Sequence, residues 1–563
     1  MKRSGENEEH PRLTSHPIES CQMSPSAKIA GQPIDVDRPS QVRHALGAVT
    51  RLFELDDRTA LRAAMLGAMI VMLIGLPLSA ALNIWLDEAF TLHSTGSGPL
   101  VAWAQAITFD GQPPVYFVLE SLWRQLDETS VVFARVPSIL FAAAAVAVIV
   151  LAAHRLAPGI PSFVVALVTA INPIVIWAAT EMRVYALVLL VGAALTWTFV
   201  EGFLVEGRTL RWRVWYTLFA VVGLYTQYYI GFIFVAHAIT MLAFRRHNMW
   251  SFLRVMAIAA AAFMPFIPLA IMHVTSSGDF VTRTTFAHAV HAMLDTVFIY
   301  VLPHNLNWTG AARYAGFCFI AILTVSLFVV GYPRVITTVQ FGVLSQWCAS
   351  VLILSVVFGI AGLPLDFVGH AIILAPSSFL VAFLFIESSY SRRIVGYISL
   401  TTFTLFALMQ FWSQYSPPLS KQGDWQKVAA MLAASDKSVP IAVFPAEFSV
   451  PLSWYLPRAI IPVPKPMPFT IDYVRATTLT GESDVSRVLD PVQAESKDLW
   501  VVTSGECPAI EPKIYNYHCR FLEAYLNQHY RIVRSVVFHG ALARLYARIP
   551  HVSSNMHGSL QEG

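Results

Sequence analysis

The sequence predicts an all-α polytopic membrane domain followed by a small α/β domain outside the membrane. The chain has 563 residues, of which 56% are hydrophobic and 13% charged, and its mean hydropathy is +0.57. A soluble chain carries about 25% charged residues, so most of this chain is expected to lie in lipid. After residue 412, charged, proline and turn residues return. The formal net charge of +3 gives no sign of a nucleic-acid partner.

The membrane domain is predicted over residues 61–412 and contains about eleven spans, each needing about 20 apolar residues. Residues 1–60 are polar and have no apolar segment near the start, which predicts a disordered cytoplasmic tail and not a signal peptide. A long apolar stretch, 214–244, is divided into two spans at Thr226-Gln227. The other expected spans are 63–82, 137–153, 160–179, 184–200, 255–274, 314–332, 343–365, 367–386 and 394–412.

Basic residues set the orientation of these spans. They fall in every second loop and on the side of the basic N-terminal tail, which is the positive-inside pattern. The loops concerned contain Arg155, Arg208, Arg245, Arg334 and Arg392. The N-terminus is therefore predicted to be cytoplasmic and the C-terminus extracytoplasmic.

The region 413–563 is predicted to be the extracytoplasmic α/β domain. It alternates a helix-like run at 425–434 with strand-like runs at 440–444, 499–503, 531–538 and 543–547. Cys507 and Cys519 lie in this domain, where thiols can oxidise. We expect them to form a disulfide, and the alternative is two free thiols.

The first outer loop, 83–136, carries the candidate chemistry. Asp87 and Glu88 follow the first span directly, and Asp110 precedes Pro113-Pro114. Apolar residues after these prolines have helical spacing over about a dozen residues, too few to cross a bilayer, so this helix should lie along the interface. The paired carboxylates are either a solvated loop or helix cap, or a general base and metal ligand at the lipid–water boundary.

A second outer element favours the chemical reading. Glu181, Arg183 and Tyr185 occupy a tight turn between two spans. An acid, a base and a phenol at such a turn cost insertion energy unless they pair or serve a site. Three of the candidate residues also have a simpler interpretation. Tyr116 and Tyr185 could belong to an aromatic belt at the membrane surface, and Arg135 could anchor its span at the interface.

The order of these motifs resembles the C-type membrane glycosyltransferases. The similarity is to the dolichyl-phosphate-mannose-protein mannosyltransferase-like group and the lipid A aminoarabinose transferases, and it covers about Asn83 to Ala547. The matching motifs are Asp87-Glu88, Asp110 with Pro113-Pro114-Val115-Tyr116, Arg135-Val136-Pro137-Ser138, Thr180-Glu181-Met182-Arg183-Val184-Tyr185, Leu224-Tyr225-Thr226-Gln227-Tyr228-Tyr229 and Gly423-Asp424-Trp425-Gln426-Lys427. The chain departs from the family pattern at Gln112, Gln227 and His370, where family members often have His, His and Arg.

The resemblance implies an enzyme that moves one sugar from a polyprenyl-phosphate donor to a hydroxyl of a lipid, glycan or protein acceptor. The reaction would occur on the outer face of a bacterial inner membrane, with inversion. Asp87 would be the general base, with Glu88 orienting it or binding a divalent metal ion together with Asp110. The remaining substrate-binding candidates are Asp110, Tyr116, Arg135, Glu181, Arg183, Tyr185, Gln227 and His370, of which Arg183, Arg135 and His370 could stabilise the phosphate.

Two other function classes remain open at this stage. A lipid or sugar transporter or flippase would have the same number of spans and the same low charge, but transporters place ionisable groups near the midplane. The acids of this chain are concentrated in outer loops, which favours the enzyme. A catalytically inactive assembly protein with an outer interaction domain is the third reading.

The orientation makes a testable prediction. Reporter fusions in the basic loops should report the cytoplasm, at Arg155, Arg246 and Arg393. Fusions in the outer segments should report the extracytoplasmic side, at Ser97, Gly278 and Ser420. A cytoplasmic signal at Ser97 or Ser420 would contradict the whole topology, because Ser97 lies in the loop of Asp87 and Ser420 precedes the C-terminal domain.

Overall fold

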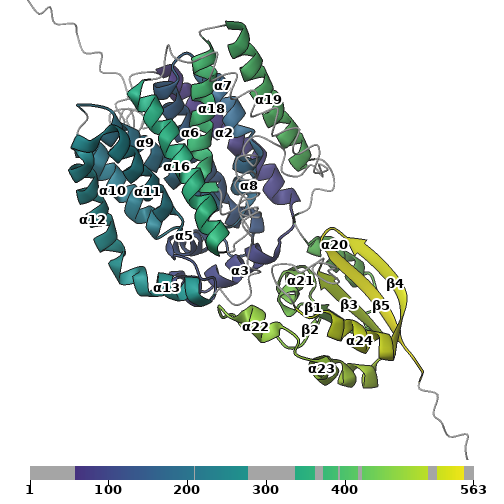
Figure 1. Ribbon diagram of the computed structural model, residues 1–563. Helices are drawn as coiled ribbons and strands as arrows, with labels where there is room; N and C mark the ends of the chain where they lie inside the picture. Colours follow the sequence, from purple (N-terminus) through teal and green to yellow (C-terminus); the bar gives the residue numbers. More distant parts are fainter. Residues whose placement is uncertain are drawn as a thin grey trace, which may run out of the picture. The chain divides into compact units, whose positions relative to one another are not determined.

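The computed structural model describes residues 58–207, 210–276, 337–361, 372–390, 393–415, 421, 423–504 and 517–550 (Figure 1). Within these ranges the chain is helical up to Tyr415, and the strands follow Pro440. The expected spans 314–332 and the first part of 367–386 fall outside the described residues. The predicted number of about eleven spans therefore stays a prediction.

Among the residues that the structure describes, four helical segments are long and apolar enough to cross a membrane: Arg58–Ala81, Val131–Leu156, Tyr185–Leu204 and Arg246–His273. The first is α2, the second is α6, and the third combines α9 (Tyr185–Phe199) with the π-helical turn Val200–Leu204. Helix α6 packs against both α2 and α9. Helix α9 is almost entirely buried, so it forms the centre of the bundle. These helices confirm the polytopic membrane domain.

The expected span 160–179 is a broken helix. It consists of α7 (Ser162–Ala170) and α8 (Pro173–Thr180), bent by 55° with respect to each other. The break has a local cause, because Pro173 has no backbone N–H to continue the helix. The side chain of Asn172 instead accepts a hydrogen bond from the backbone N–H of Ile174 at 3.1 Å and caps a new helix. If the bent pair is counted as one span, the described spans number five.

The division of 214–244 at Thr226-Gln227 is confirmed, since α10 (Leu210–Leu224) and α11 (Ile230–Phe244) are separated by a turn at these residues. The expected span 255–274 is less regular. Helix α12 (Met249–Phe263) passes through a 3-10 turn, Met264–Phe266, into α13 (Ile267–Ser276), and this turn contains Pro265. The remaining described helices of this domain are α16 (Thr338–Ala361), α18 (Ala375–Tyr390) and α19 (Arg393–Tyr415).

The outer loop 83–136 folds into three short helices, α3 (Leu86–Thr95), α4 (Pro99–Thr108) and α5 (Val115–Arg124). Helix α5 is the one predicted after Pro113-Pro114, and its burial is inverted relative to a soluble helix. The polar residues Glu120 and Arg124 are buried, whereas the apolar residues Leu119 and Leu122 are exposed. Such a helix suits a position with its apolar side against lipid.

The C-terminal domain contains a five-stranded mixed sheet in the order β2-β1-β3-β5-β4. Strands β1 (Ile441–Phe444), β2 (Ile461–Pro462) and β3 (Asp498–Ser504) are parallel. Strands β5 (Ala541–Arg548) and β4 (Tyr530–Phe538) continue the sheet in antiparallel pairs. All four strands predicted from the sequence are confirmed, as is the helix α20 (Trp425–Ala433). The two-residue strand β2 was not predicted.

Helices cover both faces of this sheet (Figure 1). On one face Phe444 and Val501 pack with α22 (Tyr473–Thr477), α23 (Glu482–Glu495) and α24 (Arg520–His529). On the other face Val443 and Val502 pack with α20 and with α21 (Ser449–Tyr455). Burial of both faces explains the continuous apolar runs in β1 and β3. Trp425 belongs to the second core, where it stacks on Phe448.

The predicted disulfide can be addressed at one of its two cysteines. Cys519 is disulfide-bonded, whereas Cys507 lies outside the described residues, so their pairing stays a prediction. We expect N-ethylmaleimide, which permeates membranes, to label Cys519 only after denaturation and reduction. Cys348 is a free thiol in α16 and serves as the positive control. Labelling of denatured protein at Cys507 without reductant would contradict the pairing.

Candidate functional site

A buried ion pair lies where the first span ends and the outer loop begins. Glu88 in α3 and Arg135 in α6 have fully buried side chains, and the Arg135 Nη2 to Glu88 Oε2 distance is 2.6 Å. Arg135 Nε donates to Glu88 Oε1 at 3.0 Å. The remaining Arg135 N–H groups donate to the carbonyls of Ser79, Leu82 and Asn83 at the end of α2. All donors of Arg135 are therefore satisfied, and the pair fixes α2, α3 and α6 to one another.

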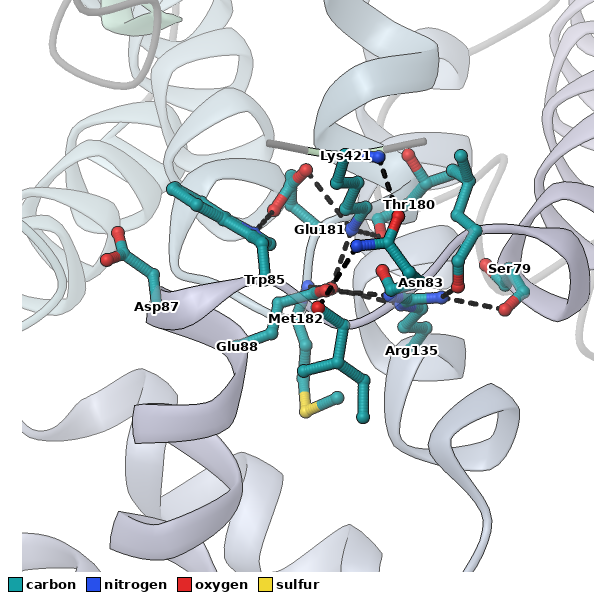
Figure 2. A network of polar contacts seen from close by, with 12 residues as sticks. Ser79, Asn83, Trp85, Asp87, Glu88, Arg135, Thr180, Glu181, Met182 and Lys421 are labelled. Carbon is teal, nitrogen blue, oxygen red and sulfur yellow. Dashed lines mark hydrogen bonds and ion pairs between the residues drawn. The ribbon is translucent and has the colours of Figure 1, made fainter. Parts of the chain in front are cut away.

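Lys421 adds a second cation to this pair (Figure 2). Its Nζ donates to Glu88 Oε1 at 2.7 Å and to the carbonyl of Thr180 at 2.8 Å. It also lies 3.1 Å from Glu181 Oε1. The other oxygen of Glu181 accepts a hydrogen bond of 2.6 Å from Trp85 Nε1. Two carboxylates and two cations thus form one buried network, which we call the Glu88 network, and its formal charges balance.

The charges of this network decide the ionisation of Glu88. Burial alone would raise its pKa, but Arg135 and Lys421 outweigh burial and hold the pKa of Glu88 at about 2. Glu88 is therefore a permanent anion at neutral pH. Burial raises the pKa of Glu181 to about 7, against the opposing charge of Lys421. A carboxylate as strongly paired as Glu88 is a poor proton acceptor.

Asp87, Asp110 and Arg183 form a separate group beside the Glu88 network, which we call the Asp87 cluster. Arg183 Nη2 lies 3.6 Å from Asp87 Oδ2, and Arg183 Nη1 lies 3.4 Å from Asp110 Oδ1. Ser94 donates to Asp110 Oδ2 at 2.6 Å. The Asp87 side chain is 26% exposed, against 2% for that of Asp110. Figure 2 shows Asp87 directed away from the network around Glu88.

The Asp87 cluster has two carboxylates and one guanidinium among these three residues. Burial raises the pKa of Asp87, although Arg183 opposes the shift. Burial also raises the pKa of Asp110, to about 6. A carboxylate with a raised pKa binds a proton more readily than one in water. Asp87 combines that property with access to solvent, which Glu88 lacks.

The C-terminal domain touches the same outer loop at a second place. The backbone N–H of Ile471 donates to the carbonyl of Thr108 at 2.9 Å. Phe469 stacks on His93, with ring centroids 3.4 Å apart, and contacts Phe109 edge-on. Phe109 immediately precedes Asp110, so residues of the C-terminal domain pack beside the Asp87 cluster.

The other predicted site residues are placed at different distances from these groups. Tyr185 forms a side-chain hydrogen bond with Arg183 and stacks on Trp177. Tyr116 is buried on the inward side of α5, and among the described contacts its hydroxyl bonds to neither Asp87 nor Asp110. Gln227 lies in the α10–α11 turn, whose Tyr225 carbonyl accepts a hydrogen bond from Val115 N–H. His370 lies outside the described residues.

The side chains around Glu88 and Asp110 decide whether these two residues fit the predicted metal site. Within the described residues, no group of three or more His, Cys, Asp or Glu side chains is arranged to hold a metal ion. Of the two candidate ligands, Glu88 has both oxygens bound by Arg135, and Oε1 is also bound by Lys421 and by Met182 N–H. Glu88 does not fit a ligand role, because its oxygens already serve cations. Metal dependence stays a prediction.

The sequence reasoning missed three members of the site. Lys421 precedes the Gly423-Asp424 motif by two residues and is not among the predicted site residues. Asn83 binds the backbone of Lys421 and Gly423, and Ser94 binds Asp110. For Lys421 a signal was present, because a lysine between the last span and a folded domain is far from the cytoplasmic side where basic residues are expected.

Comparison with known proteins returned solved structures alone. No protein-family profile and no curated protein matches the chain. ArnT from Cupriavidus metallidurans in the apo state is 13% identical, with a TM-score of 0.48 over 90% of this chain and 98% of that one. ArnT bound to undecaprenyl phosphate is 12% identical, with a TM-score of 0.47 over 90% and 99%. The arabinofuranosyltransferase AftD from Mycobacteria is 14% identical, with a TM-score of 0.37 over 88% and 40%. The chain is thus similar in structure to ArnT over 90% of its length, at low sequence identity.

The Glu88–Arg135 pair makes a prediction about stability. Glu88→Gln removes one partner of a fully buried ion pair and leaves Arg135 without its counter-charge. The variant should lose about 3 kcal/mol of unfolding free energy, read as a lower midpoint of thermal unfolding in detergent. Glu482→Gln, an exposed acid of the C-terminal domain, is the matched control. An unchanged midpoint for Glu88→Gln would show that the pair does not hold the helices together.

Proposed function

We propose that this protein is a membrane glycosyltransferase that moves a single sugar from a polyprenyl-phosphate donor to an acceptor hydroxyl. The observation that carries the proposal is the Asp87 cluster, in which a partly exposed carboxylate with a raised pKa lies beside the Arg183 guanidinium. A proton acceptor next to a fixed cation suits attack by a hydroxyl on a sugar whose leaving group is an anion.

Asp87 is the general base. An acceptor hydroxyl is a weak nucleophile at neutral pH and gains reactivity when a positioned base takes its proton. Of the two adjacent carboxylates, Glu88 is enclosed by Arg135 and Lys421 and is 0% exposed. The Asp87 side chain is partly exposed to solvent, and its Oδ2 lies 3.6 Å from Nη2 of Arg183. The proposal therefore gives the two carboxylates different roles, proton acceptor for Asp87 and support for Glu88.

The reaction is a single displacement. The acceptor oxygen forms a bond to the anomeric carbon while its proton passes to the Asp87 carboxylate. The bond between the anomeric carbon and the phosphate oxygen breaks, and its electron pair leaves with polyprenyl phosphate. Attack from the side opposite to the leaving group inverts the anomeric carbon, as in inverting glycosidases.

Arg183 would stabilise the charge that develops on the phosphate. Its position depends on Asp110, whose Oδ1 lies 3.4 Å from Nη1, and on the side-chain hydrogen bond with Tyr185. A guanidinium oriented in advance costs little reorganisation when the negative charge appears. Asp110 thus acts through Arg183 in this proposal.

The lipid part of the donor must stay in the bilayer while its phosphate reaches Arg183. Helices α4 and α5, which flank Asp110, expose apolar side chains that include Leu100, Trp103, Leu119 and Leu122. Exposed apolar surface of this extent marks a membrane or partner contact. Helix hairpin α4–α5 lying along the outer membrane surface would place the Asp87 cluster at the lipid–water boundary. The proposal also includes the location, a bacterial inner membrane, and the acceptor, whose hydroxyl belongs to a lipid, glycan or protein.

A transfer assay tests the function directly. Purified protein is offered a panel of radiolabelled polyprenyl-phosphate sugars together with a membrane extract that supplies acceptors. Movement of one label into the extract identifies both the sugar and the acceptor fraction. Transport of label across sealed vesicles without transfer would instead support a flippase.

Asp87→Asn should lower the rate of sugar transfer by about two to four orders of magnitude. The substitution keeps the shape of the side chain and removes its capacity to accept a proton. Donor binding, measured by co-purified or photo-crosslinked lipid, should change little. Asp110→Asn should cause a smaller fall, because it acts through Arg183. Transfer at the wild-type rate by Asp87→Asn would refute Asp87 as the base.

A further inference from the structure

We propose that Lys421 is a positioning residue of the catalytic site, and that through it the segment leading into the C-terminal domain holds Arg183 in place. The expected effect of Lys421 on sugar transfer rests on the proposed function, whereas its expected effect on the structure does not. The inference assigns no contact between Lys421 and substrate. Lys421 acts on the turn that joins α8 to α9, and Arg183 lies in this turn.

The ammonium group of Lys421 is fully used. Its three N–H groups face three oxygens, those of Glu88 Oε1 at 2.7 Å, the Thr180 carbonyl at 2.8 Å and Glu181 Oε1 at 3.1 Å. The side chain is 8% exposed. A lysine is rarely buried to this degree unless it is paired. Two of its three partners are consecutive residues, Thr180 at the end of α8 and Glu181 at the start of the α8–α9 turn.

That turn is a short non-helical connection between two helices. Helix α8 ends at Thr180 and α9 begins at Tyr185, so Arg183 lies in a non-helical connection. Glu181 has an extended backbone, with φ −91° and ψ 123°. The backbone N–H of Met182 donates to Glu88 Oε1 at 2.9 Å, the same oxygen that receives Lys421. The turn is therefore held from outside, by Lys421 at Thr180 and Glu181, by Trp85 at Glu181 and by Glu88 at Met182.

The backbone groups of Lys421 and Gly423 are themselves hydrogen-bonded to the membrane domain. Asn83 accepts a hydrogen bond from Lys421 N–H at 2.7 Å and donates to the carbonyl of Gly423 at 2.8 Å. Gly423 has φ +76°, and a Cβ at this position would lie 2.3 Å from Trp425 Nε1. Glycine is thus required here on both grounds. The carbonyl of Asn83 also accepts a hydrogen bond from Arg135, so this one residue binds both cations of the Glu88 network, Arg135 and Lys421.

The supports of the turn give the physical reason why loss of Lys421 should reach Arg183. With Lys421 present, the two carboxylates of the Glu88 network are balanced by two cations. Without it, Glu181 loses the cation beside its Oε1, and because burial already raises its pKa to about 7, it would take up a proton and become neutral. The Thr180 carbonyl and the Glu181 carboxyl group would then no longer be held by the ammonium group. Arg183 lies two residues beyond Glu181, so its position in the Asp87 cluster would be less strictly fixed.

The test compares two lysines six residues apart in full-length protein. Lys421→Met keeps the length of the side chain and loses the ammonium group. Lys427→Met removes a lysine that is 61% exposed and pairs with Asp424, and it is the matched control. Lys421→Ala leaves space for n-propylammonium, which restores the missing charge and N–H donors. Tetramethylammonium, which has the charge without donors, is the control for this rescue.

Two measurements are made on each variant. Hydrogen exchange of peptides that cover 180–184 should be about tenfold faster in Lys421→Met, the change expected for loss of about one net hydrogen bond. Transfer should fall about 10- to 100-fold in kcat, with little change in KM for the donor, because a misplaced group lowers the rate more than binding. In Lys421→Ala, n-propylammonium should restore part of the protection from hydrogen exchange and part of the transfer rate. Tetramethylammonium should restore neither the protection nor the rate. Lys427→Met should match wild type.

The outcomes separate this inference from the proposed function. If Lys421→Met transfers sugar at the wild-type rate, the inference is overturned, whatever its exchange rate. If wild-type protein transfers no sugar from any donor, the proposed function fails, and exchange at 180–184 then decides the structural part alone. Exchange unchanged in both Lys421 variants would overturn that part. Should Lys421→Met fail to fold, rescue of Lys421→Ala by n-propylammonium remains the deciding measurement.

Discussion

The fully buried pair of Glu88 and Arg135 is the interaction on which the rest of the site depends. Two charges are removed from water here, which is costly unless every donor and acceptor finds a partner. Arg135 meets that condition by also binding three carbonyls at the end of α2. A single side chain thus closes the C-terminus of one helix and anchors the start of another. Asp87 directly precedes Glu88 in α3, so its position also depends on this ion pair.

Adjacent carboxylates with opposite surroundings explain how the site can combine rigidity with reactivity. Glu88 is surrounded by cations and its pKa is low, so it serves as a fixed anion. Asp87 is partly exposed and burial raises its pKa, so it can exchange a proton. The sequence places them one residue apart on a helix, where successive side chains point about 100° apart. A single residue step in helix α3 therefore separates a structural charge from one that can exchange a proton.

Local patterns predicted much of the fold, whereas the site depended on contacts between distant residues. The strands at 440–444 and 499–503 could be predicted, because apolar runs of this length bounded by turn residues are typical of buried strands. The Asn172-Pro173 break also has a local signal, since a proline directly after a capping residue favours a helix start, and the single predicted span 160–179 does not include it. The inward burial of Glu120 had no such signal, since a polar helix face normally indicates water. Lys421 itself had a signal in its predicted place away from the cytoplasmic side, but its partners could not be predicted, because they lie in other parts of the chain.

The separation of Lys421 from Glu88 along the chain has a consequence for biosynthesis. The two residues are 333 positions apart, so at ordinary rates of translation Glu88 emerges roughly 20–70 s before its second cation. During that interval the membrane helices can insert, but Glu181 has no lysine and the turn that holds Arg183 is unsupported. The Glu88 network would be completed only when Lys421 has been synthesised and has reached Glu88. A chain that ends before Lys421 would therefore contain the ion pair of Glu88 and Arg135 but would lack the cation beside Glu181.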